Sequence, residues 1–459
     1  MKKTILFIVL LLIFSCKKDQ DDGFDIAVNE NLEIEDFVYK TMNVFYYWQE
    51  DVPNLADTKF NNDKQYVNFL QSFDSPFDLF DNLMHQEDRF SHITDDYVSF
   101  TKQLQSISLS NGMHYGLNVV SELEDSVIGY VRYVISGSDA DIKGIKRGDI
   151  FTHVNQVPLT LNNYRELLFS NTARYSISLA VLENQEFKPT GVTITLNNSE
   201  QEEKELFLSK TILHEGKKVG YLVYNGFNDL QDDDLLNVFN TFATEQIEEL
   251  VVDLRYNPGG SVASSQLFAG LIAGEHAEKE FGRLEFNTKL ENENSSIEII
   301  NSNIQLGLSR VFFITTQNSA SASEMLINGL KPYINTIQIG GVTVGKNVGS
   351  SAIYDYIDSE GTINPNHSWM LLPIMFKIFN SQGVSDYANG LVPDISLNEN
   401  IADFGVLGDI YEPLLQKALG VISGKVLVTN GLKTKNDASK SFKEIQLEPG
   451  IALKTTPKR

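Results

Sequence analysis

Residues 310–350 read RVFFITTQNSASASEMLINGLKPYINTIQIGGVTVGKNVGS. Val311–Thr316 is a short run of β-branched and aromatic residues, which predicts a buried strand. After a polar turn, apolar residues recur at helical spacing and predict a helix that begins near Ser321–Ala322. A serine at such a strand-to-helix turn presents its hydroxyl beside N–H groups that the first helical turn leaves unpaired.

The same stretch also offers a base for this serine. A second predicted strand, Thr336–Gly340, leads to a lysine flanked by glycine in Gly345-Lys346-Asn347. The stretch contains no histidine, but Ser-Lys pairs are a known variant of the nucleophile-base arrangement. The alternative is that SASAS is only helix N-cap chemistry and that the lysine lies in a solvated loop.

A second motif, LVVDLRYNPGG at residues 250–260, combines a predicted buried strand with a tight Pro-Gly-Gly turn. Paired glycines allow a backbone N–H to approach a substrate oxygen closely. We expect Asp253 and Arg255 to pair locally and brace this turn rather than to act directly in catalysis.

Taken together and in this order, these motifs resemble the tail-specific (C-terminal processing) serine peptidase family. The resemblance implies that Ser321 is the nucleophile and Lys346 the base. It also implies an oxyanion hole formed by the N–H of Ala322 and by the N–H of Gly259 or Gly260. Because lysine has an ordinary pKa of about 10.4, a lysine base must be desolvated, which predicts an apolar, closed pocket around Lys346.

The chain departs from the family pattern at two places. Ser350 stands where family members often carry a lysine-orienting glutamine, so it is the candidate for that role here, and Lys331-Pro332 stands where many carry an acidic residue. These departures leave open a catalytically impaired peptide-binding or scaffold lipoprotein with a vestigial protease core. A crotonase-like acyl-transfer enzyme is a further rival, but a secretory signal disfavours it because acyl-CoA substrates are cytosolic.

The resemblance covers roughly residues 31–420 and implies a multi-domain α/β protein. We expect an N-terminal helical domain, a PDZ β-sandwich-like domain and a catalytic core that forms a ClpP/crotonase-like β-β-α spiral. The expected boundaries are 1–15 for a lipoprotein signal peptide, 16–30 for a tether, 31–97 for the helical domain, 98–200 for the PDZ domain, 201–420 for the peptidase core and 421–459 for a C-terminal extension.

Residues 98–200 carry two PDZ-like features. Tyr115-Gly116-Leu117 has the form of a PDZ carboxylate-binding loop, and Ser138–Phe151 resembles the PDZ signature around its short helix. Such a domain captures an extended peptide as an added strand, so the resemblance implies recognition of substrate C-terminal tails. The alternatives are a structural spacer or a lid over the active site.

Composition and the N-terminus limit the partners and the location. A net charge of −24 argues against nucleic acid and against electrostatic binding to anionic lipid. No metal-ligand spacing is present, and we expect no metal and no cofactor. A basic and apolar start followed by Cys16 resembles a bacterial lipoprotein signal, with a plain signal peptide as the alternative. Acyl chains on Cys16 would anchor the protein to a membrane of the cell envelope, on its periplasmic or cell-surface face.

Overall fold

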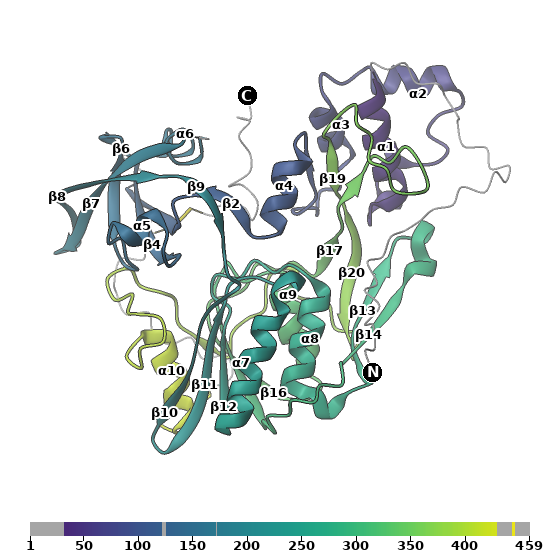
Figure 1. The fold of residues 1–459 in the computed structure, drawn as a ribbon. Coiled ribbons are helices and arrows are strands. Elements are labelled where there is room, and N and C mark those ends of the chain that lie inside the picture. Colours follow the sequence, from purple (N-terminus) through teal and green to yellow (C-terminus); the bar gives the residue numbers. More distant parts are fainter. Residues whose placement is uncertain (1–31, 122–124, 171, 429–442, 446–459) are drawn as a thin grey trace. The chain divides into compact units, whose positions relative to one another are not determined.

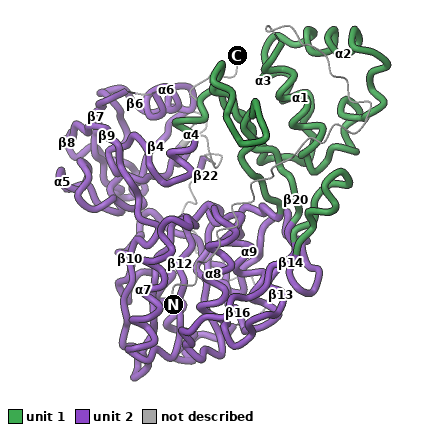
Figure 2. The backbone as a smooth tube through the Cα atoms, turned by 45° about the vertical axis from the view of Figure 1, so that its right-hand side comes forward, with its two compact units in different colours: residues 1–100, 284–295, 348–377 green, residues 101–283, 296–347, 378–459 purple. Residues whose placement is uncertain are grey.

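Figure 1 shows the fold in a computed structural model, which describes residues 32–121, 125–170, 172–428 and 443–445. The predicted signal peptide, Cys16 and the tether lie outside these residues. Two compact units make up the chain (Figure 2): residues 1–100, 284–295 and 348–377 form unit 1, and the remainder forms unit 2. Residues 348–377, which the sequence places in the catalytic core, group with the N-terminal helices in unit 1.

Unit 1 is built on amphipathic helices, and these lie within residues 31–97, as the family resemblance implies. Its helices are α1 (Glu33–Phe45), α2 (Asp63–Leu70) and α3 (Pro76–Leu83). Sequence-local signals start helix α3: the Ser75 hydroxyl accepts from the Asp78 N–H, and Pro76 takes the first helical position. Val38, Met42 and Leu79 are fully buried in one cluster, so α1 and α3 share a core.

Unit 1 also contains short strands. Strands β1 (His92–Thr94), β19 (Met370–Leu372) and β18 (Ile353–Tyr354) form a three-stranded sheet in that order. Strand β17 (Val348–Ser350) pairs antiparallel with β20 (Ile374–Asn380), a strand that continues into unit 2. Helix α4 (Tyr97–Leu104) and strands β13 (Glu280–Phe286) and β14 (Ser295–Glu298) likewise span a boundary between the units.

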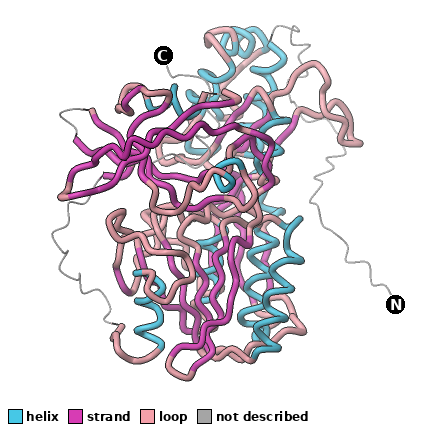
Figure 3. Tube along the Cα trace, turned by 60° about the vertical axis from the view of Figure 1, so that its left-hand side comes forward, coloured by secondary structure: helices cyan, strands magenta, loops and turns pink. Residues whose placement is uncertain are grey.

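One core of unit 2 forms around a six-stranded sheet with helices on both faces (Figure 3). Its strands are, in spatial order, β10 (Leu206–His214), β11 (Lys217–Tyr224), β12 (Glu249–Asp253), β15 (Arg310–Thr315), β16 (Asn335–Gly340) and β21 (Ile395–Ser396). All neighbours except β10 and β11 are parallel. Parallel strands are buried on both faces, which explains the apolar runs in the sequence.

Helices α7 (Asp232–Glu245), α8 (Val262–Ala273) and α9 (Ala322–Leu330) form one helical group, and α10 (Pro413–Ile422) packs on the sheet residues Val251, Phe312 and Ile337. The register pairs Asp253 in β12 with Ile314 in β15. The turns that follow these two strands therefore leave the same edge of the sheet, where open α/β sheets place their ligands.

A second sheet of unit 2 contains the predicted PDZ segment. Its strands are, in order, β22 (Lys443–Glu444), β3 (Met113–Ser121), β4 (Ser126–Val134), β5 (Ile150–Val154), β7 (Arg174–Glu183) and β8 (Glu186–Asn197), with β6 (Val157–Pro158) beside β5. Helices α5 (Asp139–Ile142) and α6 (Tyr164–Phe169) flank it, and β2 (Ile107–Ser110) pairs with β9 (Ser199–Glu202).

One expectation for this segment needs correction. Tyr115, Gly116 and Leu117 lie within strand β3 and pair with Val131, Tyr130 and Gly129, rather than forming a loop. Between Met113 and Val119, the pairing of β3 with β4 is irregular at one point, a register shift between His114 and Tyr115. The sequence motif suggests that Gly116 is a loop residue. In the structure, glycine is required at this position because a Cβ would lie 2.3 Å from the Tyr130 ring.

Within the described residues, no helix is both long enough and apolar enough to cross a bilayer. The same residues contain no group of three or more histidine, cysteine, aspartate or glutamate side chains that could hold a metal ion.

Candidate active site

Ser321 occupies a strained turn between strand β15 and helix α9. Its backbone has φ 55° and ψ −115°, a conformation that side chains other than glycine rarely adopt. Such strain persists only where the surroundings enforce it, and it is concentrated at functional sites. In α/β-hydrolases a nucleophilic serine is held on a sharp strand-to-helix turn of this kind.

The glycine turn after β12 lies directly against this serine. A Cβ built on Gly259 would lie 2.6 Å from the Ser321 Cβ and 2.9 Å from the Ala322 nitrogen, so only glycine fits there. Asn257 connects the two turns: its carbonyl accepts from the Ala320 N–H at 3.1 Å. The structure therefore brings together the two motifs that the sequence separates by about sixty residues.

Backbone hydrogen bonds distinguish the two glycines. The N–H of Gly259 donates to Asn257 Oδ1 at 2.8 Å, so it is already used within the turn. Among the described residues, neither Gly260 nor Ala322 has a hydrogen-bond acceptor for its backbone N–H. Of the two glycines that the sequence left open, Gly260 is the one whose N–H is available for an oxyanion.

Glu324, on the first turn of α9, connects the serine to the lysine loop. It is completely buried, and its Oε2 accepts from the N–H of Ser321 at 2.9 Å and from the N–H of Lys346 at 2.8 Å. Its Oε1 accepts from the N–H of Gly345 at 2.7 Å and from the Thr343 hydroxyl. Burial raises the pKa of Glu324, and these four hydrogen bonds partly offset that effect.

Sequence reasoning missed Glu324, although a signal for it exists. Ser321-Ala-Ser-Glu324 has the Ser-x-x-Glu spacing of a capping box, in which the glutamate reaches back to the N-cap N–H. Here the carboxylate makes that bond and also binds a loop more than twenty residues further along the chain.

Contacts from several other segments hold the lysine loop, residues 344–347, in place. The N–H of Val344 donates to the carbonyl of Ser319 at 3.0 Å, and the Asn347 side chain donates to the carbonyl of Ser385. Gly345 has φ 88°, and a Cβ there would lie 2.2 Å from the Ala388 oxygen. The side chain of Lys346 is half-buried, and the apolar pocket expected around it stays a prediction.

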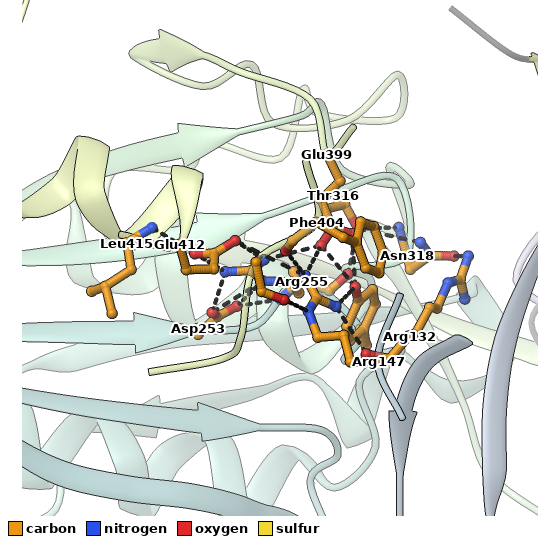
Figure 4. Close-up of polar contacts among 12 residues, drawn as sticks. Arg132, Arg147, Asp253, Arg255, Thr316, Asn318, Glu399, Phe404, Glu412 and Leu415 are labelled. Carbon is orange, nitrogen blue, oxygen red and sulfur yellow. Dashed lines mark hydrogen bonds and ion pairs between the residues drawn. The ribbon is translucent and has the colours of Figure 1, made fainter. Parts of the chain in front are cut away.

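Asp253 and Arg255 brace the turn, as the sequence predicted, within a larger buried cluster (Figure 4). Both side chains are fully buried, and Arg255 Nη2 lies 2.7 Å from Asp253 Oδ2. Arg255 Nη1 also donates to Glu412 at 2.7 Å and to Glu399 at 3.0 Å. Burial alone would raise the pKa of Glu399, but Arg255 and Arg147 lower it to about 2.

Arg147, from the PDZ-like signature, belongs to the same cluster. Its Nη2 lies 2.7 Å from Glu399 Oε1, and its Nη1 donates to the Tyr256 hydroxyl at 2.6 Å. The six-stranded sheet and the second sheet of unit 2 therefore share buried ionic contacts beside the Asp253–Gly260 turn. Neither Glu399 nor Glu412 was predicted from the sequence.

The remaining candidates are distributed as follows. Ser350 ends strand β17 in unit 1 and pairs with Ile374, so its lysine-orienting role stays a prediction. Lys331 follows helix α9 and lines a polar pocket of about 250 Å³ with Asp394. Cys16 lies outside the described residues.

Comparisons with known proteins identify the family of this chain. The profile described as Peptidase family S41 matches residues 218–397, and the one described as Peptidase S41 N-terminal domain matches residues 33–92. By its fold and its family matches, this protein is a serine peptidase. Within that class, the chain belongs to peptidase family S41, the tail-specific or C-terminal processing proteases.

Relatives are distant but extend over most of the chain. A "Probable CtpA-like serine protease" from Staphylococcus epidermidis RP62A is 21% identical over 86% of this chain and 70% of its own length. Another protein of that name, from S. epidermidis ATCC 12228, is 22% identical over 75% of this chain and 62% of its own length.

Solved structures show the same fold. A "Putative S41 protease" from Bacteroides fragilis matches with a TM-score of 0.65 and 26% identity, over 85% of this chain and 97% of that one. The photosystem II D1 C-terminal processing protease matches with a TM-score of 0.52 and 15% identity, over 85% of this chain and 99% of that one.

Proposed function

We propose that this serine peptidase is an endopeptidase of the cell envelope that cleaves proteins with accessible C-terminal tails through a Ser321–Lys346 dyad. The observation that carries the proposal is the shared carboxylate: Glu324 Oε2 accepts from the backbones of both residues. This arrangement fixes the lysine loop against the serine turn, and a base must lie within reach of its nucleophile.

In the proposed reaction, neutral Lys346 accepts the Ser321 hydroxyl proton while the oxygen attacks the scissile carbonyl. The N–H groups of Ala322 and Gly260 stabilise the resulting oxyanion, and the N-terminus of α9 adds to the field. Lys346 then gives the proton to the leaving amine, which departs as the acyl-enzyme forms. Water, activated by the lysine, hydrolyses that ester and releases the new carboxyl terminus.

Tail recognition is assigned to the second sheet of unit 2, as a PDZ domain. A PDZ domain binds a peptide by adding it as a strand at a sheet edge, and strand β3 with Tyr115, Gly116 and Leu117 is the candidate edge. Support comes from the Arg147 contacts, which connect this sheet to the turn beside the serine.

The envelope location rests on the N-terminal sequence. A signal peptide at residues 1–15, followed by acylation of Cys16, would tether the peptidase to a membrane through residues 16–30. The formal charge of −24 is consistent with a protein that depends on acyl chains rather than basic residues for membrane attachment.

Cleavage of an unfolded protein with an apolar C-terminus tests the dyad and the tail preference together. Residues 24–459 should cleave this substrate, and the Ser321→Ala and Lys346→Ala variants should not. Amidation of the substrate C-terminus should slow cleavage by the parent protein. Equal cleavage by all three proteins would contradict the dyad, and indifference to amidation would contradict tail recognition.

A further inference from the structure

A short segment of the same chain, residues 443–445, occupies the edge of the candidate peptide-binding sheet. Strand β22 pairs antiparallel with β3, with Lys443 opposite Val119 and Glu444 opposite Asn118. The Ile445 N–H donates to the Leu117 carbonyl at 2.8 Å. Among the residues that the structure describes, β3 pairs only with β22 and β4, so without residues 443–445 it would be an edge strand of this sheet.

Strand β22 runs antiparallel to β3, the direction proposed here for a C-terminal tail along this edge. Along the segment from Lys443 to Ile445, the partners on β3 run back from Val119 to Leu117 and so approach Gly116 and Tyr115. A peptide bound by strand addition approaches a carboxylate-binding end in this sense.

Ile445 supplies an apolar anchor next to this edge. It is partly buried against the cluster that contains Leu117 and Val127 of the sheet. Leu167 and Leu168 of helix α6 belong to the same cluster, so the isoleucine packs on a core to which both the sheet and a helix contribute.

Glu444 meets a site that fits an acidic side chain. Its Oε1 forms an ion pair with Arg132 and accepts from the Tyr130 hydroxyl at 2.7 Å, while its Oε2 accepts from the Gln317 side chain. Arg132 and Glu444 are only 15% and 20% exposed, so their attraction is less screened by water than that of a surface pair. The Tyr130 phenol is close to this edge because Gly116 has no side chain to block its ring.

We propose that residues 443–445 are an internal ligand of the β3 edge and that substrate tails bind by displacing them. The site thereby selects tails in which an acidic residue precedes an apolar one, as Glu444 precedes Ile445. This inference rests on the proposed tail recognition and adds its regulation. Because the segment belongs to the same chain as the sheet, a substrate tail must compete with a covalently attached ligand.

The test measures peptide affinity without cleavage, in Ser321→Ala protein. The probe is a fluorescent peptide with the sequence of residues 441–445 and a free C-terminus. Glu444→Arg combined with Ile445→Pro should release the internal ligand, since it reverses the charge beside Arg132 and removes the N–H that bonds to Leu117. Glu275→Arg, at an exposed position on the 3₁₀ turn Gly274–His276, is the charge-matched control.

If the segment occupies the edge in about nine-tenths of molecules, its release lowers the Kd for the probe about tenfold, and the control keeps the parent Kd. Hydrogen exchange on the parent needs no variant: the amide of Ile445 should be protected, and saturating unlabelled peptide should abolish that protection. A probe with lysine in place of the glutamate should bind more weakly to the released protein.

The outcomes separate the two proposals. Equal Kd values for the released and parent proteins, with rapid exchange at Ile445, would overturn the internal ligand and leave tail recognition intact. Absence of binding to every form, with Ile445 still protected after peptide addition, would overturn tail recognition and with it displacement by substrate.

Discussion

Ser321 and Lys346 donate their backbone N–H groups to the same atom, Glu324 Oε2, over 2.9 and 2.8 Å. A single buried carboxylate therefore sets the spacing between the turn that carries the candidate nucleophile and the loop that carries the candidate base. Glu324 does this through the backbone, and so it acts as a positioning residue.

Replacing Glu324 by glutamine should lower kcat/KM about 100-fold, because the amide nitrogen cannot accept the N–H bonds that hold the two segments and small misplacements are costly in catalysis. Steady-state kinetics on the tail substrate measure this effect. Glu275→Gln at an exposed position is the matched control. Activity within about twofold of the parent would show that the shared carboxylate does not position the dyad.

Gly259→Ala should abolish activity, because the added Cβ would lie 2.6 Å from the Ser321 Cβ and must displace the serine turn. Gly216→Ala provides the control: it also has positive φ, at 85°, but a Cβ there meets nothing within 4 Å. The control should cost only about 1 kcal/mol of backbone strain and keep its kcat. If both variants retained activity, the tight contact between the two turns would be refuted.

Arg255→Leu should lower the free energy of unfolding by about 3–5 kcal/mol, since it leaves buried Asp253 and Glu412 without their cation. Urea titration with a fluorescence readout measures the loss. Lys188→Ala removes an exposed partner of Glu183 and should change stability by less than about 1 kcal/mol. Equal effects of the two substitutions would mean that the buried cluster does not brace the turn.

Glu205 should make the folded protein less stable as pH rises from 4.5 toward 7. Burial raises its pKa from 4.5 to about 7, with the Ser106 hydrogen bond opposing and the Glu203 charge adding to that effect. Across this window the folded state holds more protons than the unfolded state, so stability falls with increasing pH. Glu205→Gln should flatten the dependence of the urea midpoint on pH, and an unchanged slope would contradict the assignment.

Local patterns were sufficient to predict the elements that carry the site. The apolar run before the serine is strand β15, and the helix begins at Ala322, because burial and helical periodicity act over a few residues. The pairing of Asp253 with Arg255 was also predictable, since the two residues are separated by only one position.

Contacts distant in sequence were not predictable in this way. Glu399 and Glu412 meet Arg255 across separations of 144 and 157 residues, and no local period marks such partners. The pairing of Lys443 and Glu444 with β3 joins residues even further apart in the sequence, and its short polar sequence reads as an extension. Ser350 lies in unit 1 because the chain leaves unit 2 at residue 348 and returns to it after residue 377. The residues next to Ser350 carry no signal for this change of unit.

The most direct measurement is the intact-protein mass after brief exposure to a fluorophosphonate, followed by peptide mapping. The Ser-Lys account predicts one adduct, on Ser321, that forms rapidly in the parent, at least about 100-fold more slowly in Lys346→Ala and not at all in Ser321→Ala. An adduct on another residue, or labelling of Lys346→Ala at the parent rate, would contradict the assignment of Ser321 as nucleophile with Lys346 as its base.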